Sequence, residues 1–146
     1  MPEDRAEDIK IGTDIVEIQR FRGLSSDSPF FKRVFTENER KYCDGYPDPA
    51  PHYATTFAGK EAVVKAISSF CNLPMDAIQI LRNKNGAPYV ELHQDCQFSI
   101  RLSLSHSTNH AVAVAIAFVH SITDQKHIQG LLDDTIKELL PGGEMS

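Results

Sequence analysis

Two runs near the end of the chain, residues 98–105 and 110–118, constrain the fold more than any other part of the sequence. In the first run, isoleucine and leucine alternate with arginine and serine, which is typical of a strand with one buried and one polar face. The second run consists mainly of alanine, valine and isoleucine. Because only residues 106–109 separate the two runs, we expect a strand pair in a mostly antiparallel sheet.

A second strand pair is expected over residues 77–82 and 87–92. Between these runs lies Asn85-Gly86, and this dipeptide is the strongest short signal of a hairpin. Residues 52–70 form the longest helical segment, in which small residues allow neighbours to approach closely: Ala58, Ala62 and Ala66. Together these elements predict an α+β domain in which helices pack against a mostly antiparallel sheet.

The N-terminal part predicts further elements. Residues 9–18 have a strand pattern that we expect to end in a turn around Gly12-Thr13-Asp14, so that Asp14 marks the change from strand to helix. The helix would cover roughly residues 15–24, and a loop would follow over 25–29. Thr36 and Glu39 form a capping box, which predicts a helix through about Tyr42, before a proline-rich loop over 44–51.

The length and composition are those of one soluble domain, with 146 residues, of which 41% are hydrophobic and 24% charged. We expect a flexible N-terminus over residues 1–8 and a main domain over 9–120. A C-terminal extension over 121–146 would contain a helix near 128–140.

Several classes of protein are disfavoured. The cysteines have no CxxC spacing, which favours a cytoplasmic protein over a disulfide framework. No apolar run is long enough to span a membrane, and the N-terminus lacks the apolar core of a signal peptide. The net charge of −5 argues against nucleic-acid binding, for which a basic surface is expected.

Glu61 and Lys65 lie four residues apart and so share one face of their expected helix. The simpler interpretation is a surface ion pair worth about 0.2–0.5 kcal/mol. The alternative is a magnesium and phosphate site, because Mg²⁺ often binds through one or two carboxylates and the phosphates of a substrate. Asp14 could supply the second carboxylate, although such an aspartate is more often a turn former or helix cap.

His106 follows a strand with a polar face, where it either closes the turn or donates to a phosphate together with Ser105 and Ser107. Pro88 either completes the hairpin turn or offers a flat apolar surface to an aromatic ring. No GxSxG, P-loop or GxGxxG motif supports a serine hydrolase, a nucleotide triphosphatase or a Rossmann enzyme. Cys71 follows an apolar helix and is expected to be buried and unreactive.

Taken together, these segments resemble the bacterial holo-[acyl-carrier-protein] synthases, the small class of 4'-phosphopantetheinyl transferases. The segments follow the family's order and span about residues 9–119. They are Ile11 to Ile18 (IGTDIVEI), Val34 to Cys43 (VFTENERKYC), Phe57 to Ala66 (FAGKEAVVKA), Asn85 to Pro88 (NGAP) and Leu102 to Ser107 (LSLSHS).

The resemblance implies the fold of the 4'-phosphopantetheinyl transferases, assembled as a homotrimer with active sites between protomers. It implies transfer of the 4'-phosphopantetheine arm of coenzyme A to a serine of an apo acyl carrier protein, with release of 3',5'-ADP, for fatty-acid or polyketide synthesis. Asp14 and Glu61 match the Mg²⁺ ligands, and Lys65 matches the lysine that contacts the coenzyme A diphosphate. These three form the implied catalytic set, with Glu61, directly or through a water, as the candidate general base.

The resemblance also assigns binding residues. Pro88, Ser105 and His106 fall where the family holds the nucleotide end of coenzyme A. Arg20 matches a basic residue that contacts the carrier protein. Arg22, together with Lys32 and Arg33, adds to a basic segment that suits an acidic carrier-protein helix.

The chain departs from the family pattern near coenzyme A. Family members usually continue Lys-Ala-Leu-Gly-Thr-Gly, whereas residues 65–70 are Lys-Ala-Ile-Ser-Ser-Phe. Thr56 and Ala87 stand where many members have an arginine and a lysine. Either the affinity for coenzyme A is lower or it rests on other groups. The departures also leave open a non-catalytic carrier-protein or nucleotide-binding module on the same fold.

Overall fold

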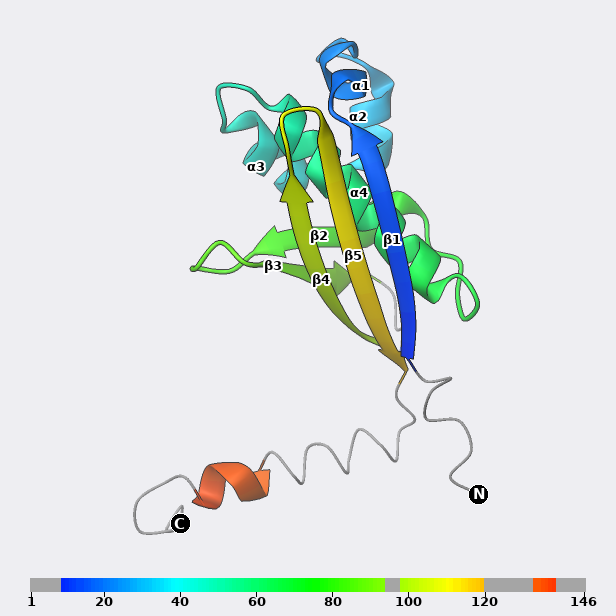
Figure 1. The fold of residues 1–146 in the computed structure, drawn as a ribbon, viewed down its shortest axis with the longest axis vertical. Coiled ribbons are helices and arrows are strands. Elements are labelled where there is room, and N and C mark those ends of the chain that lie inside the picture. Colours follow the sequence, from blue (N-terminus) through cyan, green and yellow to red (C-terminus); the bar gives the residue numbers. More distant parts are fainter. Residues whose placement is uncertain (1–8, 94–97, 120–132, 139–146) are drawn as a thin grey trace.

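The computed structural model describes residues 9–93, 98–119 and 133–138. Its elements are β1 (Ile9–Glu17), α1 (Gln19–Arg22), α2 (Pro29–Val34), α3 (Glu37–Asp44), α4 (Ala50–Ile67), the 3-10 turn η1 (Met75–Ala77), β2 (Ile78–Arg82), β3 (Pro88–Leu92), β4 (Phe98–His106) and β5 (His110–Val119). Figure 1 shows α4 behind the three long strands and the short helices gathered at one end. The predicted α+β class with antiparallel sheets and packed helices is confirmed.

The larger sheet has the strand order β1-β5-β4, and both pairings are antiparallel. Every second residue of β5 is an alanine with no exposed surface: Ala111, Ala113, Ala115 and Ala117. These small side chains let α4 lie close to the middle of the sheet. The strand pair β4–β5, which we predicted from the alternating pattern, is confirmed.

β1 crosses α4 at Gly12, where there is no room for a side chain. A Cβ atom on Gly12 would lie 2.0 Å from the carbonyl oxygen of Ala62 and 2.7 Å from the amide nitrogen of Ala66. The glycine is therefore needed for a close approach of two backbones rather than for a turn. The turn predicted at Gly12-Thr13-Asp14 is wrong, because β1 pairs with β5 from Ile9 to Glu17 without a break.

The region after β1 also differs from our expectation. In place of the helix predicted over residues 15–24, the structure has only the short helix α1. The next helix, α2, begins at the end of the predicted loop 25–29. Ser28 caps α2 by accepting a hydrogen bond from the Phe30 amide at 3.3 Å, and Pro29 occupies the first turn. Serine followed by proline is a helix start signal that our sequence interpretation took for a loop.

The hairpin of β2 and β3 is confirmed as a separate two-stranded sheet. Gly86 has a φ of 82°, in the left-handed region that favours glycine. The Asn83 side chain accepts hydrogen bonds from the amides of Asn85 and Ala87 at 2.9 and 3.0 Å. Pro88 begins β3 and pairs with Arg82 across the hairpin.

The two remaining helices, α3 and α4, are confirmed, but the bounds of α4 differ from those that we predicted. The predicted capping box of Thr36 and Glu39 is present and begins α3. The expected helix 52–70 is α4, which begins earlier, inside the predicted loop 44–51, and ends earlier.

The predicted termini fall largely outside the described residues. Residues 133–138 form a short exposed helix within the predicted helix 128–140. The predicted flexible segment 1–8 and the rest of the extension 121–146 are outside the part of the chain that the structure describes. Within that part, no helix has the length and apolar character needed to cross a membrane.

Candidate functional site

The carboxylate of Asp14 and the ammonium group of Lys65 meet where β1 crosses α4. Lys65 Nζ donates to Asp14 Oδ1 at 3.0 Å and to the carbonyl oxygen of Thr13 at 2.9 Å. Asp14 lies within β1 rather than at its end, on the same face as Gly12. Its side chain is 16% exposed, whereas that of Lys65 is 53% exposed. The close approach at Gly12 therefore brings a strand carboxylate within reach of the helix.

Glu61 lies one helical turn before Lys65 on α4 and is half-buried. None of the ion pairs among the described residues joins Glu61 to Lys65. The interpretation as a simple surface pair on one helix is therefore not supported. Lys65 instead connects the helix to Asp14, so that both candidate carboxylates lie beside the same lysine.

The oxygen donors where β1 crosses α4 suit a magnesium ion. Asp14 and the Thr13 carbonyl already hold a positive group, the ammonium of Lys65. Within the described residues, no group of three or more His, Cys, Asp or Glu side chains could hold a metal. A cation bound by Asp14 and Glu61 would thus keep open positions for substrate phosphates, which is typical of Mg²⁺.

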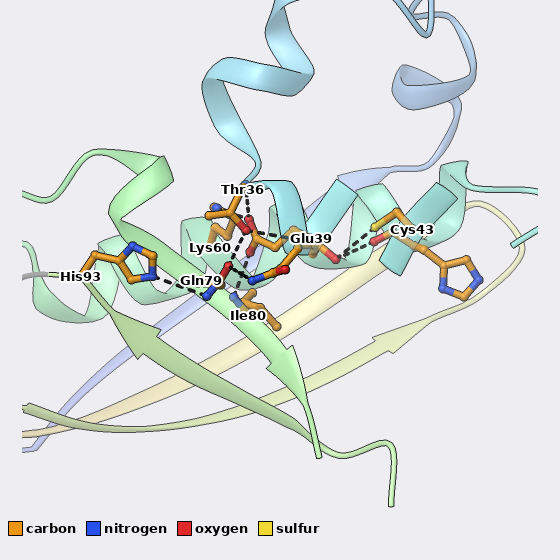
Figure 2. Close-up of polar contacts among 10 residues, drawn as sticks. Thr36, Glu39, Cys43, Lys60, Gln79, Ile80 and His93 are labelled. Atoms are coloured by element: carbon orange, nitrogen blue, oxygen red, sulfur yellow. Dashed lines mark hydrogen bonds and ion pairs between the residues drawn. The ribbon is translucent and has the colours of Figure 1, made fainter. Parts of the chain in front are cut away.

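Figure 2 shows a buried ion pair that our sequence interpretation missed. Glu39 and Lys60 are both buried, and Lys60 Nζ donates to Glu39 Oε1. The same carboxylate accepts the amide of Thr36 at 2.9 Å and the amide of Ile80 at 2.8 Å. One side chain thus joins α3, α4 and β2. Only its capping role could be predicted, because Lys60 is 21 residues away in the sequence.

Burial is costly for Lys60 and sets its electrostatics. Desolvation lowers the pKa of Lys60, and the charge and hydrogen bond of Glu39 act in the opposite direction. A buried lysine needs such a partner, because an isolated charge in a protein interior is strongly unfavourable. Lys60 immediately precedes Glu61, so the pair also fixes the rotation of α4 at the site.

A polar chain extends from this pair along β2. Thr36 Oγ1 donates to Gln79 Oε1 at 2.7 Å, and Gln79 Nε2 lies 3.4 Å from His93 Nε2 (Figure 2). Gln79 is a buried polar residue in β2, a strand that we predicted from its apolar residues. The chain connects β2 to α3 and holds the hairpin against the rest of the domain.

Cys43 is not suited to act as a nucleophile. Burial raises the pKa of Cys43 to about 12, and its Sγ lies 3.8 Å from Thr56 Oγ1. Such a thiol stays protonated and unreactive at neutral pH. Cys71 is half-buried rather than fully buried as predicted, and Cys96 lies outside the described residues.

The predicted nucleotide-end residues are only partly brought together. His106 ends β4, as expected, and its ring lies 6.4 Å from that of His52 in α4. Ser105 is exposed and points to the opposite face of the sheet, because successive strand residues alternate. Pro88 lies in the separate hairpin. His52 and Glu61 are nine residues apart on α4, about 14 Å along the helix.

The predicted carrier-protein residues lie on the short helices. Arg20 and Arg22 are exposed on α1, and Arg22 Nη2 forms an ion pair with Asp48 Oδ2 at 2.7 Å. Beside them is a cleft of about 460 Å³, lined in part by Arg22, Lys32 and Tyr53. The basic residues and the cleft form one exposed region at the N-terminal end of α4.

Comparisons with known proteins point to one family. Residues 10–117 match the family model described as the 4'-phosphopantetheinyl transferase superfamily. A holo-[acyl-carrier-protein] synthase from Chlorobaculum parvum is 39% identical over 113 residues, which cover 74% of this chain and 97% of that protein. One from Clostridium tetani is 38% identical over 116 residues, covering 73% of this chain and 92% of that protein.

Solved structures show the same fold. A Bacillus anthracis holo-(acyl-carrier-protein) synthase in complex with CoA (3',5'-ADP) has a TM-score of 0.67 and 29% identity, covering 76% of this chain and 96% of that one. The Helicobacter pylori holo-[acyl-carrier-protein] synthase in complex with coenzyme A has a TM-score of 0.66 and 28% identity. The match covers 73% of this chain and 98% of that chain.

Proposed function

The chain belongs to the 4'-phosphopantetheinyl transferase superfamily, and we propose that it acts as a holo-[acyl-carrier-protein] synthase. It transfers the 4'-phosphopantetheine arm of coenzyme A to a serine of an apo acyl carrier protein and releases 3',5'-ADP. The observation that carries this proposal is the contact between Asp14 and Lys65 beside Glu61. It supports a site where Asp14 and Glu61 would bind a cation and Lys65 would bind a phosphate.

The site residues divide into a cation-binding pair and a phosphate-binding lysine. Asp14 and Glu61 would hold Mg²⁺, which when bound neutralises the diphosphate of coenzyme A and stabilises charge on the leaving phosphate. Lys65 neutralises Asp14 in the protein alone. Because its side chain is 53% exposed and flexible, its ammonium can turn from Asp14 to the diphosphate.

The chemical step is a displacement at phosphorus. The carrier-protein serine oxygen attacks the β-phosphorus of coenzyme A, and the bond from this phosphorus to the oxygen of 3',5'-ADP breaks. Lys65 donates hydrogen bonds to the leaving phosphate as its negative charge grows. Glu61, directly or through a water, is our candidate to receive the serine proton.

We place the carrier protein at the basic region of α1 and α2. Arg20, Arg22, Lys32 and Arg33 are exposed there, although the chain as a whole has a net charge of −5. An acidic helix of the carrier protein would compete with Asp48 for Arg22. The cleft beside Arg22 offers a mixed polar and apolar surface for the same partner.

We further propose a homotrimer, working in the cytoplasm, in which the outer face of the larger sheet is covered. Three isoleucines of β1 are exposed on that face: Ile9 by 51%, Ile11 by 65% and Ile15 by 66%. Val112 of the neighbouring strand adds to them. Such an apolar face is typical of an interaction site. Because His106 and Asp14 lie on β4 and β1, with β5 between them, contributions from two protomers would complete one coenzyme A site.

The proposal is tested by incubating the protein with coenzyme A, Mg²⁺ and several apo carrier proteins. Intact-mass spectrometry should show a carrier protein that has gained one phosphopantetheine group. A carrier whose acceptor serine is replaced by alanine is the matched control and should gain nothing. No addition to any carrier would refute the transferase and favour a binding module on the same fold.

A further inference from the structure

The cleft beside Arg22 has the size of a small-molecule site and is separate from the proposed catalytic residues. Its volume of about 460 Å³ falls within the range of about 300–1,000 Å³ that is usual for ligand pockets. Its walls come from α1, α2, α3 and the start of α4, the helices gathered at one end of the molecule in Figure 1. Asp14, Glu61 and Lys65 do not line it.

Aromatic side chains form an apolar wall of the cleft. Phe31 and Tyr53 pack edge to face, with ring centroids 4.7 Å apart. Phe21 of α1 and Leu24 just after this helix continue the wall. An apolar group placed against these side chains would leave water for an apolar surface, which is favourable.

Charged side chains of both signs also line the cleft: Arg22, Lys32, Arg40, Asp27, Asp44 and Asp48. Two of the acids already have a donor. Arg22 Nη2 binds Asp48 Oδ2 at 2.7 Å, and the Tyr53 hydroxyl donates to Asp44 Oδ1 at 2.8 Å. Burial raises the pKa of Tyr53 and the hydrogen bond to Asp44 raises it further, so this hydroxyl keeps its proton.

Arg40 and Lys32 have no comparable partner. Neither takes part in an ion pair with any residue that the structure describes. The Nε–H group of Arg40 is buried, and within the described part of the chain it has no hydrogen-bond acceptor. A buried donor without an acceptor is unfavourable. An anion in the cleft would therefore supply the guanidinium with the negative charge that the chain itself does not provide.

From this geometry we infer that the cleft binds a small monocarboxylate with an apolar body. Arg40 binds the carboxylate, Lys32 adds a second positive charge, and the aromatic wall covers the apolar body. A single negative charge suits the site, because its lining holds three bases and three acids. A dianion such as a phosphate monoester would be repelled by Asp27, Asp44 and Asp48.

A carboxylate in the cleft would compete with the carrier protein. Arg22 and Lys32 line the cleft and also belong to the basic region where we place that partner. An occupied cleft removes these charges from carrier-protein docking but leaves the proposed catalytic residues open to coenzyme A. This competition rests on the proposed function, whereas binding of the carboxylate does not.

Calorimetry of the full chain with octanoate, acetate and octylamine tests the binding. Octanoate should bind, and its affinity should exceed that of acetate by about fourfold for each methylene that is buried. Octylamine has the same chain length but the opposite charge and should not bind. Arg40→Gln should weaken octanoate binding at least about tenfold. Lys41→Gln removes an exposed charge from the next position of α3, outside the cleft, and should keep the wild-type affinity.

Three results would overturn the inference. Octylamine could bind as tightly as octanoate, Arg40→Gln could keep the wild-type affinity for octanoate, or the wild-type protein could fail to bind octanoate. In the last case, carrier-protein binding that depends on Arg40 would assign the cleft to the carrier protein instead. Thermal melting shows whether each variant folds, and Lys32→Gln, which should weaken octanoate binding at least about threefold, gives a second reading if Arg40→Gln does not.

Transfer kinetics test the competition. Octanoate should raise the KM for the apo carrier protein severalfold and leave both kcat and the KM for coenzyme A unchanged. A rise in the KM for coenzyme A alone would contradict competition with the carrier protein. A wild-type protein that transfers nothing but binds octanoate through Arg40 would refute the proposed function and keep the carboxylate site.

Discussion

Lys60 and Lys65 lie on the same helix and show two uses of one residue type. Lys60 is buried and bound to Glu39, whereas Lys65 is exposed and reaches Asp14 across the contact with β1. A buried pair loses much stability when one partner is removed, because the other charge is left without compensation. An exposed pair contributes little to stability. The first lysine is therefore structural, and the second is available for chemistry.

Methionine substitutions should separate these two roles. Lys60→Met should lower the free energy of unfolding by about 3–5 kcal/mol, measured by urea denaturation, because it leaves the buried Glu39 carboxylate without a positive partner. Lys65→Met should cost less than about 1 kcal/mol yet abolish transfer. The double variant Glu39→Leu/Lys60→Met should be more stable than Lys60→Met alone. A Lys60→Met protein as stable as wild type would contradict the assignment.

At the scale of elements, the crossing of β1 and α4 positions the site. The sequence pattern predicted both elements, because alternation and helical spacing are local signals. It misplaced Asp14, because a glycine that permits close packing has the same local signature as a glycine in a turn. Only the pairing of β1 with β5, nearly a hundred residues apart, shows that the strand continues through Asp14.

Gly12→Ala should therefore impair transfer as well as stability. Its new Cβ would meet the α4 backbone, so β1 must shift and carry Asp14 away from Lys65. We expect a loss of about 1–3 kcal/mol in urea denaturation and a larger fractional loss of transfer rate. Gly23→Ala is the matched control, because its Cβ would lie at an ordinary 3.6 Å from the nearest atom. If both variants lost stability and transfer rate to a similar extent, the close contact of β1 and α4 at Gly12 would not be what positions the site.

At the scale of the whole molecule, the sheet has two unlike faces. One is covered by α4, and the other exposes the isoleucines of β1. Alternation could predict that β1 has two faces, but not that the face with the isoleucines stays uncovered among the described residues while α4 covers the other. The buried pair of Glu39 and Lys60 was likewise beyond local patterns, because it joins segments that are distant in the sequence.

The outer face should control assembly. Wild-type protein should have three times its 16.3 kDa chain mass in analytical ultracentrifugation. Ile11→Glu/Ile15→Glu should sediment as a monomer and lose transfer, because charges on this face oppose its burial. Ile136→Glu, at an exposed apolar residue of the C-terminal helix, is the control and should keep the wild-type mass. A monomeric wild type with full activity would refute the proposed trimer.

The most direct test of the account is the Mg²⁺ dependence of phosphopantetheine transfer in a Glu61→Gln variant. Glu17→Gln, which neutralises an exposed acid at the end of β1, serves as the matched control. We predict that Glu61→Gln loses transfer by at least about a hundredfold, with partial recovery at high Mg²⁺, because one of two carboxylate ligands is lost. Glu17→Gln should match wild type. Near-normal transfer and Mg²⁺ dependence in Glu61→Gln would contradict the central claim that Asp14, Glu61 and Lys65 form the catalytic site.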